Sequence, residues 1–578
     1  MKAIGLRQVT SAVSFWPLLV NTLAVASTVA VAALAEAPLA GLVALVPLAV
    51  IIWRQRRVLL RVPRGVGGIG RYQTARFILI AAAAVHLYLA GELGALGIVA
   101  LVLALVALAT EPMIRSLNGI AVPYASGFPN REERNRAAFR YGGMFTLNVL
   151  ALLVLEVAGL SPRMLIPLAV ALSAVSIGIA VAALVDVVGR IRTRRTFQDE
   201  LPQILEEMAP VFYVYWHAPP RSAFQVTMWL PYLERLGVPF VMVVRTVGNF
   251  RQLQNATELP VLLRRSLTDL DDLIVPSARG VFYVNNAMRN NHMVRYAQLT
   301  HIQLLHGESD KASSATPIIR MYDLDFVAGQ AAIDRFEKFG VTMRPEIFRI
   351  VGRPQVEEVA EARGAINELA QPSVLYAPTW LGYQAETNYS SLPVGPVIVR
   401  ALLERGCRIV FRPHPYSERA PELREASRQI REMLAADAEQ TGREHLYGPL
   451  AEKEMTVVDC FNAADAMISD VSAVVGDFLH SGKPLAMVSP RTEADEFVEQ
   501  FPMARAAYVL VVRDGEVANL GEVIDDLTIT DPRSKERRRW ATYYLGDIPR
   551  ETYAEYFVAV ARDELGLEPV PSDDDSGS

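Results

Sequence analysis

The sequence predicts two parts of different fold class, an all-α membrane domain followed by a soluble α/β region with parallel sheets. Of the 578 residues, 51% are hydrophobic, and the long apolar runs concentrate before about residue 190. After about Pro202, short apolar runs rich in β-branched residues alternate with amphipathic stretches. This alternation is typical of parallel sheets with helices on both faces.

Six apolar stretches in the first third are candidate membrane spans, because a helix needs about 20 apolar residues to cross the hydrocarbon core. They cover approximately residues 11–35, 38–53, 77–93, 94–110, 144–160 and 164–188. Some are near the lower length limit. A tight hairpin at Glu36-Ala37 fits better than a cleaved signal peptide, because no small-residue cleavage site followed by polar sequence is present.

Arginines in the connections predict the orientation of this domain. They are frequent after the second, fourth and sixth stretches, whereas the opposite connections contain almost none apart from Arg163. The positive-inside rule therefore places both termini, and everything after residue 195, in the cytoplasm of an integral inner-membrane protein. Glu156 is a candidate for lipid or ion contact, and Asp186 is near enough to Arg190 to form a pair.

Charge and cysteine content exclude some classes of function. The net charge is only −5, and no long basic block follows the membrane domain, so nucleic acid is not an expected partner. Cys407 and Cys460 lack metal-ligand spacing and are too few for a disulfide framework. A reducing compartment is the natural interpretation.

The soluble part contains two sets of predicted strands with a break near residues 360–372. The first set comprises residues 211–216, 240–244, 273–275, 281–284, 302–305, 324–327 and 348–351, and the second comprises residues 374–377, 408–412, 467–470, 485–488 and 508–512. Two sets predict two doubly wound domains. Residues 534–564 are typical of aromatic-rich helices, and the acidic end of the chain is typical of disorder.

Polar residues that follow predicted strands are the candidate site residues, because ligands of open α/β sheets bind beyond the carboxyl ends of the strands. They are the segment from His306 to Lys311, Thr379 with Trp380, Arg412 with His414, and Asp470 with Ser472. His306 is either a turn residue or a neutral imidazole that accepts a hydroxyl proton. His414, held between two prolines, either binds phosphate oxygens together with Arg412 or only shapes a turn.

The stretch Phe461–Leu485 predicts a strand, a polar turn and a helix that carries Asp477 and ends near Gly482-Lys483-Pro484. Free backbone N–H groups and the helix dipole at such a turn favour an anionic phosphate, so a diphosphate could bind there. Alternatively, Asp470 and Ser472 merely cap the helix.

Six short segments occur in the order and approximate spacing of the CDP-glycerol glycerophosphotransferases, which include teichoic-acid primases and polymerases. They are His306-Gly307, YDLDFVAG at 322–329, VGRP at 351–354, LYAPTW at 375–380, FRPHP at 411–415, and ISDVSAVVGDF at 468–478 with Lys483-Pro484. The sequence resembles this family over about residues 300–490, and the ordered set is more specific than any single motif.

The resemblance implies a GT-B fold, in which two Rossmann-like domains face a cleft. The expected domains are a transmembrane domain of about six helices at 1–195, an acceptor-side domain at 196–365, a CDP-donor domain at 366–533, helices that pack back at 534–565, and a disordered acidic tail at 566–578. The implied reaction moves glycerol phosphate, or a related polyol phosphate, from a CDP-activated donor to a hydroxyl of a lipid-linked cell-envelope acceptor and releases CMP.

Site residues follow from the resemblance, residue by residue. It implies His306 as general base with His414 as a second catalytic residue, donor contacts from Thr379, Arg412, Asp470, Ser472 and Asp477, and an acceptor side at Ser309, Asp310 and Lys311. No cofactor beyond the CDP-activated donor is implied. Mg²⁺ is compatible with the chemistry, but no acidic cluster indicates a site for it.

The sequence departs from the family pattern at three points. A Pro-Leu-Lys-like segment usually follows the His-Gly pair, whereas this sequence has Glu308 and Ser309. The usual second serine of the Asp-x-Ser turn is replaced by Ala473. Typical members are peripheral on the membrane, whereas this sequence contains candidate membrane spans.

Two other hypotheses about function therefore stay open. One is a GT-B glycosyltransferase that uses a nucleotide sugar for a lipid-linked envelope glycan, and the other is a transporter or scaffold that only senses a nucleotide.

Overall fold

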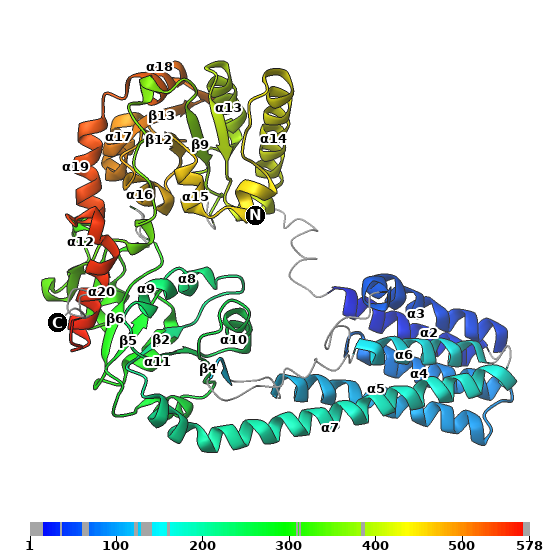
Figure 1. The fold of residues 1–578 in the computed structure, drawn as a ribbon. Helices are drawn as coiled ribbons and strands as arrows, with labels where there is room; N and C mark the ends of the chain where they lie inside the picture. Colours follow the sequence, from blue (N-terminus) through cyan, green and yellow to red (C-terminus); the bar gives the residue numbers. More distant parts are fainter. Residues whose placement is uncertain are drawn as a thin grey trace. The chain divides into compact units, whose positions relative to one another are not determined.

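The structure is a computed structural model that describes residues 15–34, 37–60, 69–120, 125–128, 142–158, 162–307, 310, 314–382 and 388–569 (Figure 1). The chain divides into two compact units, Met1–Leu201 and Pro202–Ser578. The predicted site residues Ser309 and Lys311 lie outside the described residues, as do residues 570–578 of the predicted tail and much of the arginine-rich connecting sequence.

The first unit is helical. Its elements are α2 (Phe15–Leu34), α3 (Ala37–Leu60), α4 (Gln73–Leu89), α5 (Ala95–Ile120), β1 (Ala125–Ser126), α6 (Gly142–Val157) and α7 (Pro162–Met208), the last of which continues into the second unit. Each predicted apolar stretch falls on one of these helices. Three segments of the described residues are long and apolar enough to cross a membrane, namely Trp16–Ala33, Ala95–Leu117 and Met164–Met208, while α4 and α6 provide shorter apolar helices.

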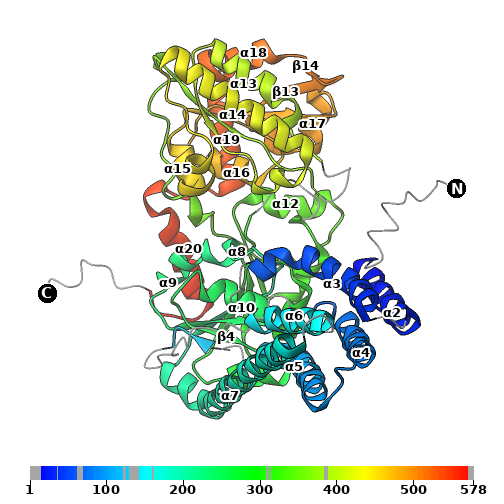
Figure 2. The same ribbon diagram turned by 90° about the vertical axis from the view of Figure 1, so that its right-hand side faces the viewer.

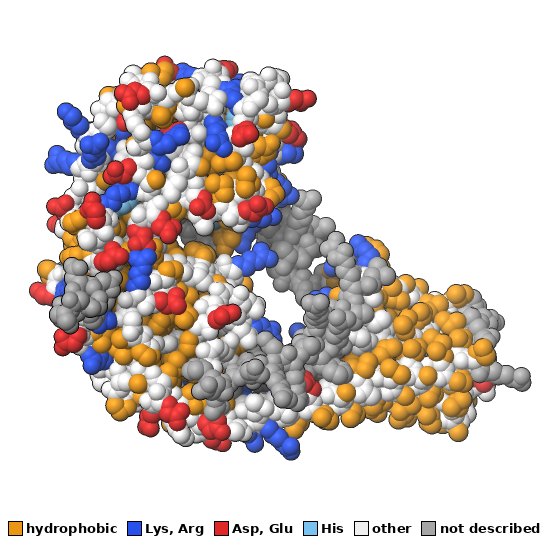
Figure 3. Space-filling view, viewed as in Figure 1, with side chains coloured by type: hydrophobic (Ala, Val, Ile, Leu, Met, Phe, Trp, Pro, Cys, Tyr) orange, Lys and Arg blue, Asp and Glu red, His pale blue; other side chains and the backbone are white. Residues whose placement is uncertain are grey.

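The surface of this unit is largely hydrophobic in the view of Figure 3, as a bilayer-facing surface requires. Leu18, Val29 and Val185 are each more than half exposed, at 61%, 64% and 68%. The predicted pair near the end of the apolar part of α7 is confirmed, because Arg190 Nε lies 2.9 Å from a carboxylate oxygen of Asp186. Exposed apolar helices of this kind support an association with membranes.

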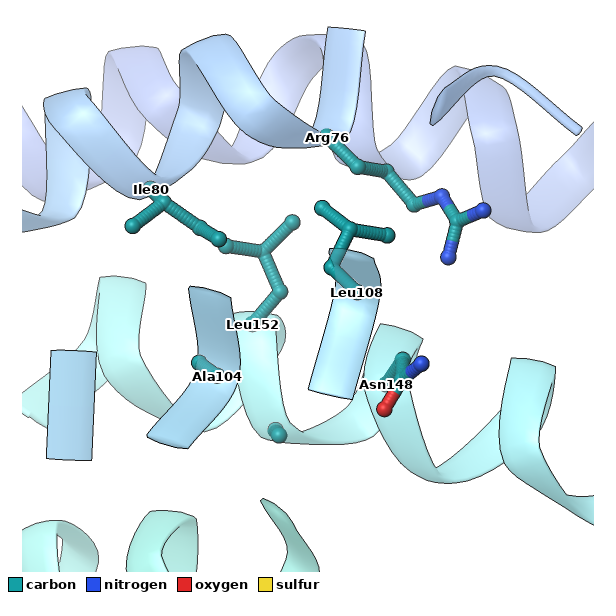
Figure 4. A pocket seen from close by; sticks show the side chains of 7 residues that line it. Arg76, Ile80, Ala104, Leu108, Asn148 and Leu152 are labelled. Atoms are coloured by element: carbon teal, nitrogen blue, oxygen red, sulfur yellow. The ribbon is translucent and has the colours of Figure 1, made fainter. Parts of the chain in front are cut away.

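A buried polar chain joins four helices inside the first unit. Arg76 of α4 donates from Nη1 and Nη2 to the two carboxylate oxygens of Glu111 in α5, each at 2.7 Å. Asn148 of α6 donates to Glu111 at 2.7 Å and accepts from Ser176 of α7 at 2.7 Å. Figure 4 shows Arg76 and Asn148 lining a small, otherwise apolar cavity. The arginine and the glutamate thus neutralise each other away from water.

Glu111→Ala leaves the Arg76 guanidinium buried and unpaired, since that side chain is 1% exposed. The free energy of unfolding is expected to fall by about 3 kcal/mol. An SDS titration of the detergent-solubilised protein, followed by circular dichroism, measures it. Asp186→Ala, which removes the partly exposed pair of α7, serves as control and should cost less than about 1 kcal/mol. Equal losses for both variants would contradict this account of the buried pair.

The second unit begins with a parallel sheet. Its strands are β2 (Phe212–Trp216), β3 (Phe240–Val244), β4 (Val261–Leu263), β5 (Gly280–Tyr283), β6 (Thr300–Gln303), β7 (Leu324–Val327) and β8 (Phe348–Ile350), in the order β4-β3-β2-β5-β6-β7-β8. Phe212 of β2 is in register with Phe240 and Gly280 on its two sides. The strands β2 and β3 are buried along their whole length, which explains their continuous apolar sequence.

One predicted strand of this sheet is wrong. Leu273 is the last residue of a 3₁₀ helix, Thr268–Leu273, and residues 274 and 275 form no strand. The strand that pairs with β3 is β4 instead. The carboxylate of Asp269 accepts the backbone N–H groups of Arg265 and Ser266, each at 2.9 Å, and thereby starts a helical turn. The local capping hydrogen bonds therefore favour a helical turn here, although the apolar run predicts a strand.

The second sheet carries the other predicted strands. They are β9 (Ser373–Ala377), β10 (Arg408–Phe411), β11 (Ala466–Ser469), β12 (Leu485–Ser489) and β13 (Tyr508–Arg513), all parallel, with the antiparallel β14 (Glu516–Val517) at one edge, in the order β10-β9-β11-β12-β13-β14. Met467 of β11 is in register with Leu375 of β9 and Leu485 of β12. The predicted fold class of two Rossmann-like domains in a GT-B arrangement is confirmed.

Helices cover the faces of both sheets (Figure 2). Those of the first domain are α8 (Phe224–Thr227), α9 (Leu230–Glu234), α10 (Val247–Gln254), α11 (Asn291–Val294) and α12 (Gln330–Lys338), and those of the second are α13 (Gly395–Glu404), α14 (Pro421–Thr441), α15 (Val457–Asn462), α16 (Ala473–Leu479), α17 (Ala494–Gln500) and α18 (Leu520–Asp525).

The last two helices contact both domains. Helix α19 (Ser534–Leu545) packs against α12 of the first domain and α16 of the second. Helix α20 (Tyr553–Glu564) returns to the first domain, where the rings of Phe557 and Trp229 lie 5.3 Å apart. A Cβ at Gly329 would lie 2.6 Å from the Tyr543 carbonyl, so the approach of α19 requires glycine there.

Candidate functional site

The turn after β6 places His306 at the carboxyl edge of the first sheet. The side-chain oxygen of Gln303 accepts the N–H groups of Leu304 and Leu305 at 3.1 and 3.0 Å. Leu305 has φ 52°, a left-handed conformation that is costly for a leucine. The indole N–H of Trp229 holds the Leu305 carbonyl at 2.6 Å. The surrounding contacts thus impose a strained backbone immediately before the histidine.

The hydrogen bonds of His306 define its tautomer. Nδ1 lies 2.9 Å from the carbonyl oxygen of Val284, which can only accept, so Nδ1 carries the proton. Nε2 lies 3.3 Å from the amide nitrogen of Gln225. That amide is oriented because its oxygen accepts from Trp216 at 3.2 Å and from Asn285 at 2.9 Å. Nε2 of His306 is therefore the unprotonated, basic atom.

The environment keeps His306 neutral. Burial lowers its pKa from the ordinary value of 6.5, and the positive charge of Arg353 lowers it further, while the hydrogen bond to Val284 acts in the opposite direction. A neutral imidazole whose Nε2 is unprotonated can accept a hydroxyl proton at neutral pH. Arg353 is itself paired with the carboxylate of Asp477 in α16, at 3.2 Å from Nη2. The predicted donor residue Asp477 thus contacts an arginine of the other domain.

Asp470 is a buried residue that holds two loops at the carboxyl edge of the second sheet. The side chain is fully buried, and its oxygens accept the N–H of Thr379 at 2.6 Å and that of Ser391 at 3.1 Å. The carbonyl of Thr379 accepts the hydroxyl of Ser390 at 2.7 Å. Asp470 and Thr379 are therefore brought together, as predicted strand-end residues should be. Their contacts fix the loops after β9 and β11, and their donor-binding role stays a prediction.

His414 is held with the opposite tautomer to His306. Its Nδ1 accepts the N–H of Tyr416 at 3.1 Å, so Nε2 carries the proton of the neutral ring. The ring stacks on Trp380 with the centroids 6.0 Å apart. An N–H in this position can donate to a phosphate oxygen.

Arg412 has a structural role in the second domain. Its Nη1 donates to the carbonyls of Ala451 and Met455, the latter at 2.9 Å, and so holds the π-helical turn Leu450–Glu454. The predicted contact of Arg412 with a donor diphosphate stays a prediction.

The two domains meet where His306-Gly307 approaches the start of α16. A Cβ added to Gly307 would lie 3.4 Å from the Cβ of Ala473, the first residue of α16. Ser472 is the N-cap of this helix, and its side chain makes no capping hydrogen bond. The His306-Gly307 turn of the first domain and the predicted phosphate turn of the second domain are thus neighbours.

Asp310 ties the loop after His306 to the second domain. It is 8% exposed, and its carboxylate accepts the N–H of Met503 at 2.8 Å and the hydroxyl of Tyr544 at 2.9 and 3.0 Å. Arg335 lies 3.8 Å away. Asp310 therefore links the first domain to the second domain through hydrogen bonds. Its predicted acceptor-side role stays a prediction.

Sequence reasoning missed Gln225 and Asn285, which orient His306, because no local pattern marks either residue. No group of three or more His, Cys, Asp or Glu side chains that could hold a metal ion occurs among the described residues.

A family model matches part of the chain. Residues 352–502 match the family model described as CDP-Glycerol:Poly(glycerophosphate) glycerophosphotransferase. This match confirms the resemblance predicted from the motifs, and with it an enzyme of the CDP-glycerol glycerophosphotransferase type. None of the curated proteins matches the chain.

Several solved structures resemble the chain. The MnaA–UDP co-structure from S. aureus has 18% identity and a TM-score of 0.41, covering 63% of this chain and 99% of that one. A UDP-N-acetylglucosamine 2-epimerase from Listeria monocytogenes has 14% identity and a TM-score of 0.41, covering 62% and 97%. The wall teichoic acid polymerase TagF soaked with CDPG has 13% identity and a TM-score of 0.41, covering 66% and 96%.

The tautomer of His306 predicts a pH profile. Because its pKa is lowered, the neutral base persists on acidification, and the acidic limb of kcat/KM for transfer should lie below pH 6.5. Gln225→Glu places a carboxylate against Nε2, raises this pKa and should move the limb to higher pH by about one unit. The exposed Gln371→Glu is the control and should leave the limb in place. An unchanged limb in the Gln225 variant would contradict the assignment.

Proposed function

We propose that this chain transfers glycerol phosphate, or a related polyol phosphate, from a CDP-activated donor to a hydroxyl of a lipid-linked cell-envelope acceptor and releases CMP. The observation that carries the proposal is the position of neutral His306, basic at Nε2, against the start of α16. Helix α16 lies inside the segment that matches the glycerophosphotransferase family.

The reaction follows from this arrangement. The acceptor hydroxyl gives its proton to Nε2 of His306 while its oxygen attacks the phosphorus that bears the glycerol. The bond from that phosphorus to the CMP oxygen breaks, and CMP leaves with the bonding electrons. Phosphoryl transfer needs little covalent help from the protein, so positioning and charge stabilisation supply the rate.

Donors for the phosphate oxygens are available on the second domain. Ala473, the first residue of α16, lies beside the His306-Gly307 turn, and we infer that the backbone N–H groups at this helix start and the hydroxyl of Ser472 donate to the phosphate. The Nε2–H of His414 is the further donor that its tautomer provides. These groups favour the transition state because its negative charge lies on the transferring oxygens.

The helical unit supports the choice of acceptor. Its three apolar helices of membrane-spanning length would keep the transferase domains at the surface where a lipid-linked substrate resides. The arginine-rich connections favour a cytoplasmic location for these domains, where nucleotide-activated donors are found.

The direct test is product release by the purified full chain in detergent, supplied with a lipid-linked acceptor. CMP should appear with CDP-glycerol or another CDP-polyol, and no UDP should appear with UDP-sugars. Release of UDP from a sugar nucleotide, with no CMP from any CDP-polyol tried, would establish the glycosyltransferase alternative instead.

His306→Gln removes the base but retains an amide that can donate to the Val284 carbonyl. The rate of CMP release at saturating substrates should fall by about 100-fold or more, because general base catalysis contributes that much. The affinity for CDP, measured by calorimetry, should stay within about twofold because the donor contacts lie on the other domain. Turnover close to that of the unchanged protein would exclude His306 as the base.

A further inference from the structure

Apart from His306, a group of basic side chains lies at the carboxyl edge of the first sheet. Arg245 directly follows β3, Arg289 lies after β5, and His292 belongs to α11, the next helix in the chain. Parallel strands bring these positions to the edge that also carries His306. We call Arg245, Arg289 and His292 the strand-end basic cluster.

Arg245 is a buried guanidinium that pairs with no carboxylate of the described residues. It is 5% exposed, and it donates to the Tyr215 hydroxyl at 3.2 Å and to the Arg265 carbonyl at 3.1 Å. Nη1 also lies 2.9 Å from Nδ1 of His292, and Nε has no partner among the residues that the structure describes. A buried charge without a counter-charge is unfavourable, so a bound anion would stabilise this edge.

His292 is oriented to donate. The guanidinium of Arg245 can only donate, so Nδ1 of His292 accepts and Nε2 carries the proton of the neutral ring. Burial lowers the pKa of His292, and Arg245, Arg289 and Arg295 lower it further. The ring therefore presents an N–H group beside two arginines without adding a charge of its own at neutral pH.

Positive charge is in excess at this edge. Arg245 and Arg289 both lower the pKa of His292 and of the neighbouring His217, after burial as the largest cause. The neighbouring Arg295 pairs with Asp271 at 2.9 Å. Arg289 is exposed and forms no ion pair within the described part of the chain. Its guanidinium is thus available to an anion in solution.

A short chain of hydrogen bonds connects His217, on which the charges of Arg289 and Arg245 act, with His306. The Asn285 amide nitrogen donates to the carbonyl of His217 at 3.1 Å and to the oxygen of Gln225 at 2.9 Å. The amide nitrogen of Gln225 in turn lies 3.3 Å from Nε2 of His306. One asparagine and one glutamine therefore separate the neighbourhood of the cluster from the atom that would receive the hydroxyl proton.

We propose that the strand-end basic cluster binds a phosphate group of the acceptor. Arg289 and His292 donate to the phosphate oxygens, while Arg245 supplies buried charge and holds His292 in the donating tautomer. The proposal rests on the proposed function, and it defines the acceptor as one that carries phosphate close to its attacking hydroxyl. Such an acceptor is the end of a polyol-phosphate chain or a short glycan on a lipid diphosphate.

Initial-rate kinetics of the full chain in detergent test this proposal with Arg289→Gln. At saturating CDP-glycerol, the KM for a lipid-linked acceptor ending in glycerol phosphate should rise by about tenfold or more, because a charge-assisted contact is lost. The KM for CDP-glycerol and kcat should stay within about twofold. His292→Gln should act in the same direction, and Arg400→Gln, an exposed arginine of α13, is the matched control that should change nothing.

A second acceptor, the same lipid-diphosphate glycan without glycerol phosphate, separates the two sources of phosphate. A rise in KM confined to the glycerol-phosphate acceptor identifies a polyol phosphodiester, and a rise with both acceptors identifies the lipid diphosphate. An unchanged KM for both acceptors in both variants overturns the proposal if the unchanged protein releases CMP. Absence of CMP release from the unchanged protein contradicts the proposed function itself.

Discussion

The buried carboxylate of Asp310 is the constraint on which the arrangement of the two sheets around the site depends. Asp310 follows His306 by four residues. Its carboxylate accepts a hydrogen bond from Met503 of the second domain and another from Tyr544 of α19. This tie keeps the His306-Gly307 turn against Ala473 at the start of α16. A base on one domain can serve a phosphate on the other only if this separation is maintained.

Two strand ends are each shaped by a buried polar side chain that accepts hydrogen bonds from the backbone. Gln303 holds the left-handed turn before His306, and Asp470 holds the loops after β9 and β11. Both side chains are fully buried. Their hydrogen bonds remove conformational freedom that the reacting groups would otherwise lose in the transition state. Replacing them would therefore impair catalysis through the loops that they hold.

The sequence was sufficient where a signal is local. Continuous apolar runs predicted eleven of the strands. The sequence was insufficient where capping hydrogen bonds or contacts between distant residues determine the structure. The strand predicted at 273–275 does not form, because the hydrogen bonds of Asp269 start a helical turn before it. Gln225 contacts His306 across 81 residues of sequence, and the excess charge around Arg245 exists only once the strand ends converge.

A structure of the full chain with CDP-glycerol bound tests the central claim most directly. The account predicts that the donor phosphates lie between the Ser472-Ala473 turn and His306, with room for a hydroxyl about 3 Å from Nε2 of His306. Phosphates held elsewhere on the second domain, with His306 out of reach of the phosphorus that bears the glycerol, would contradict it.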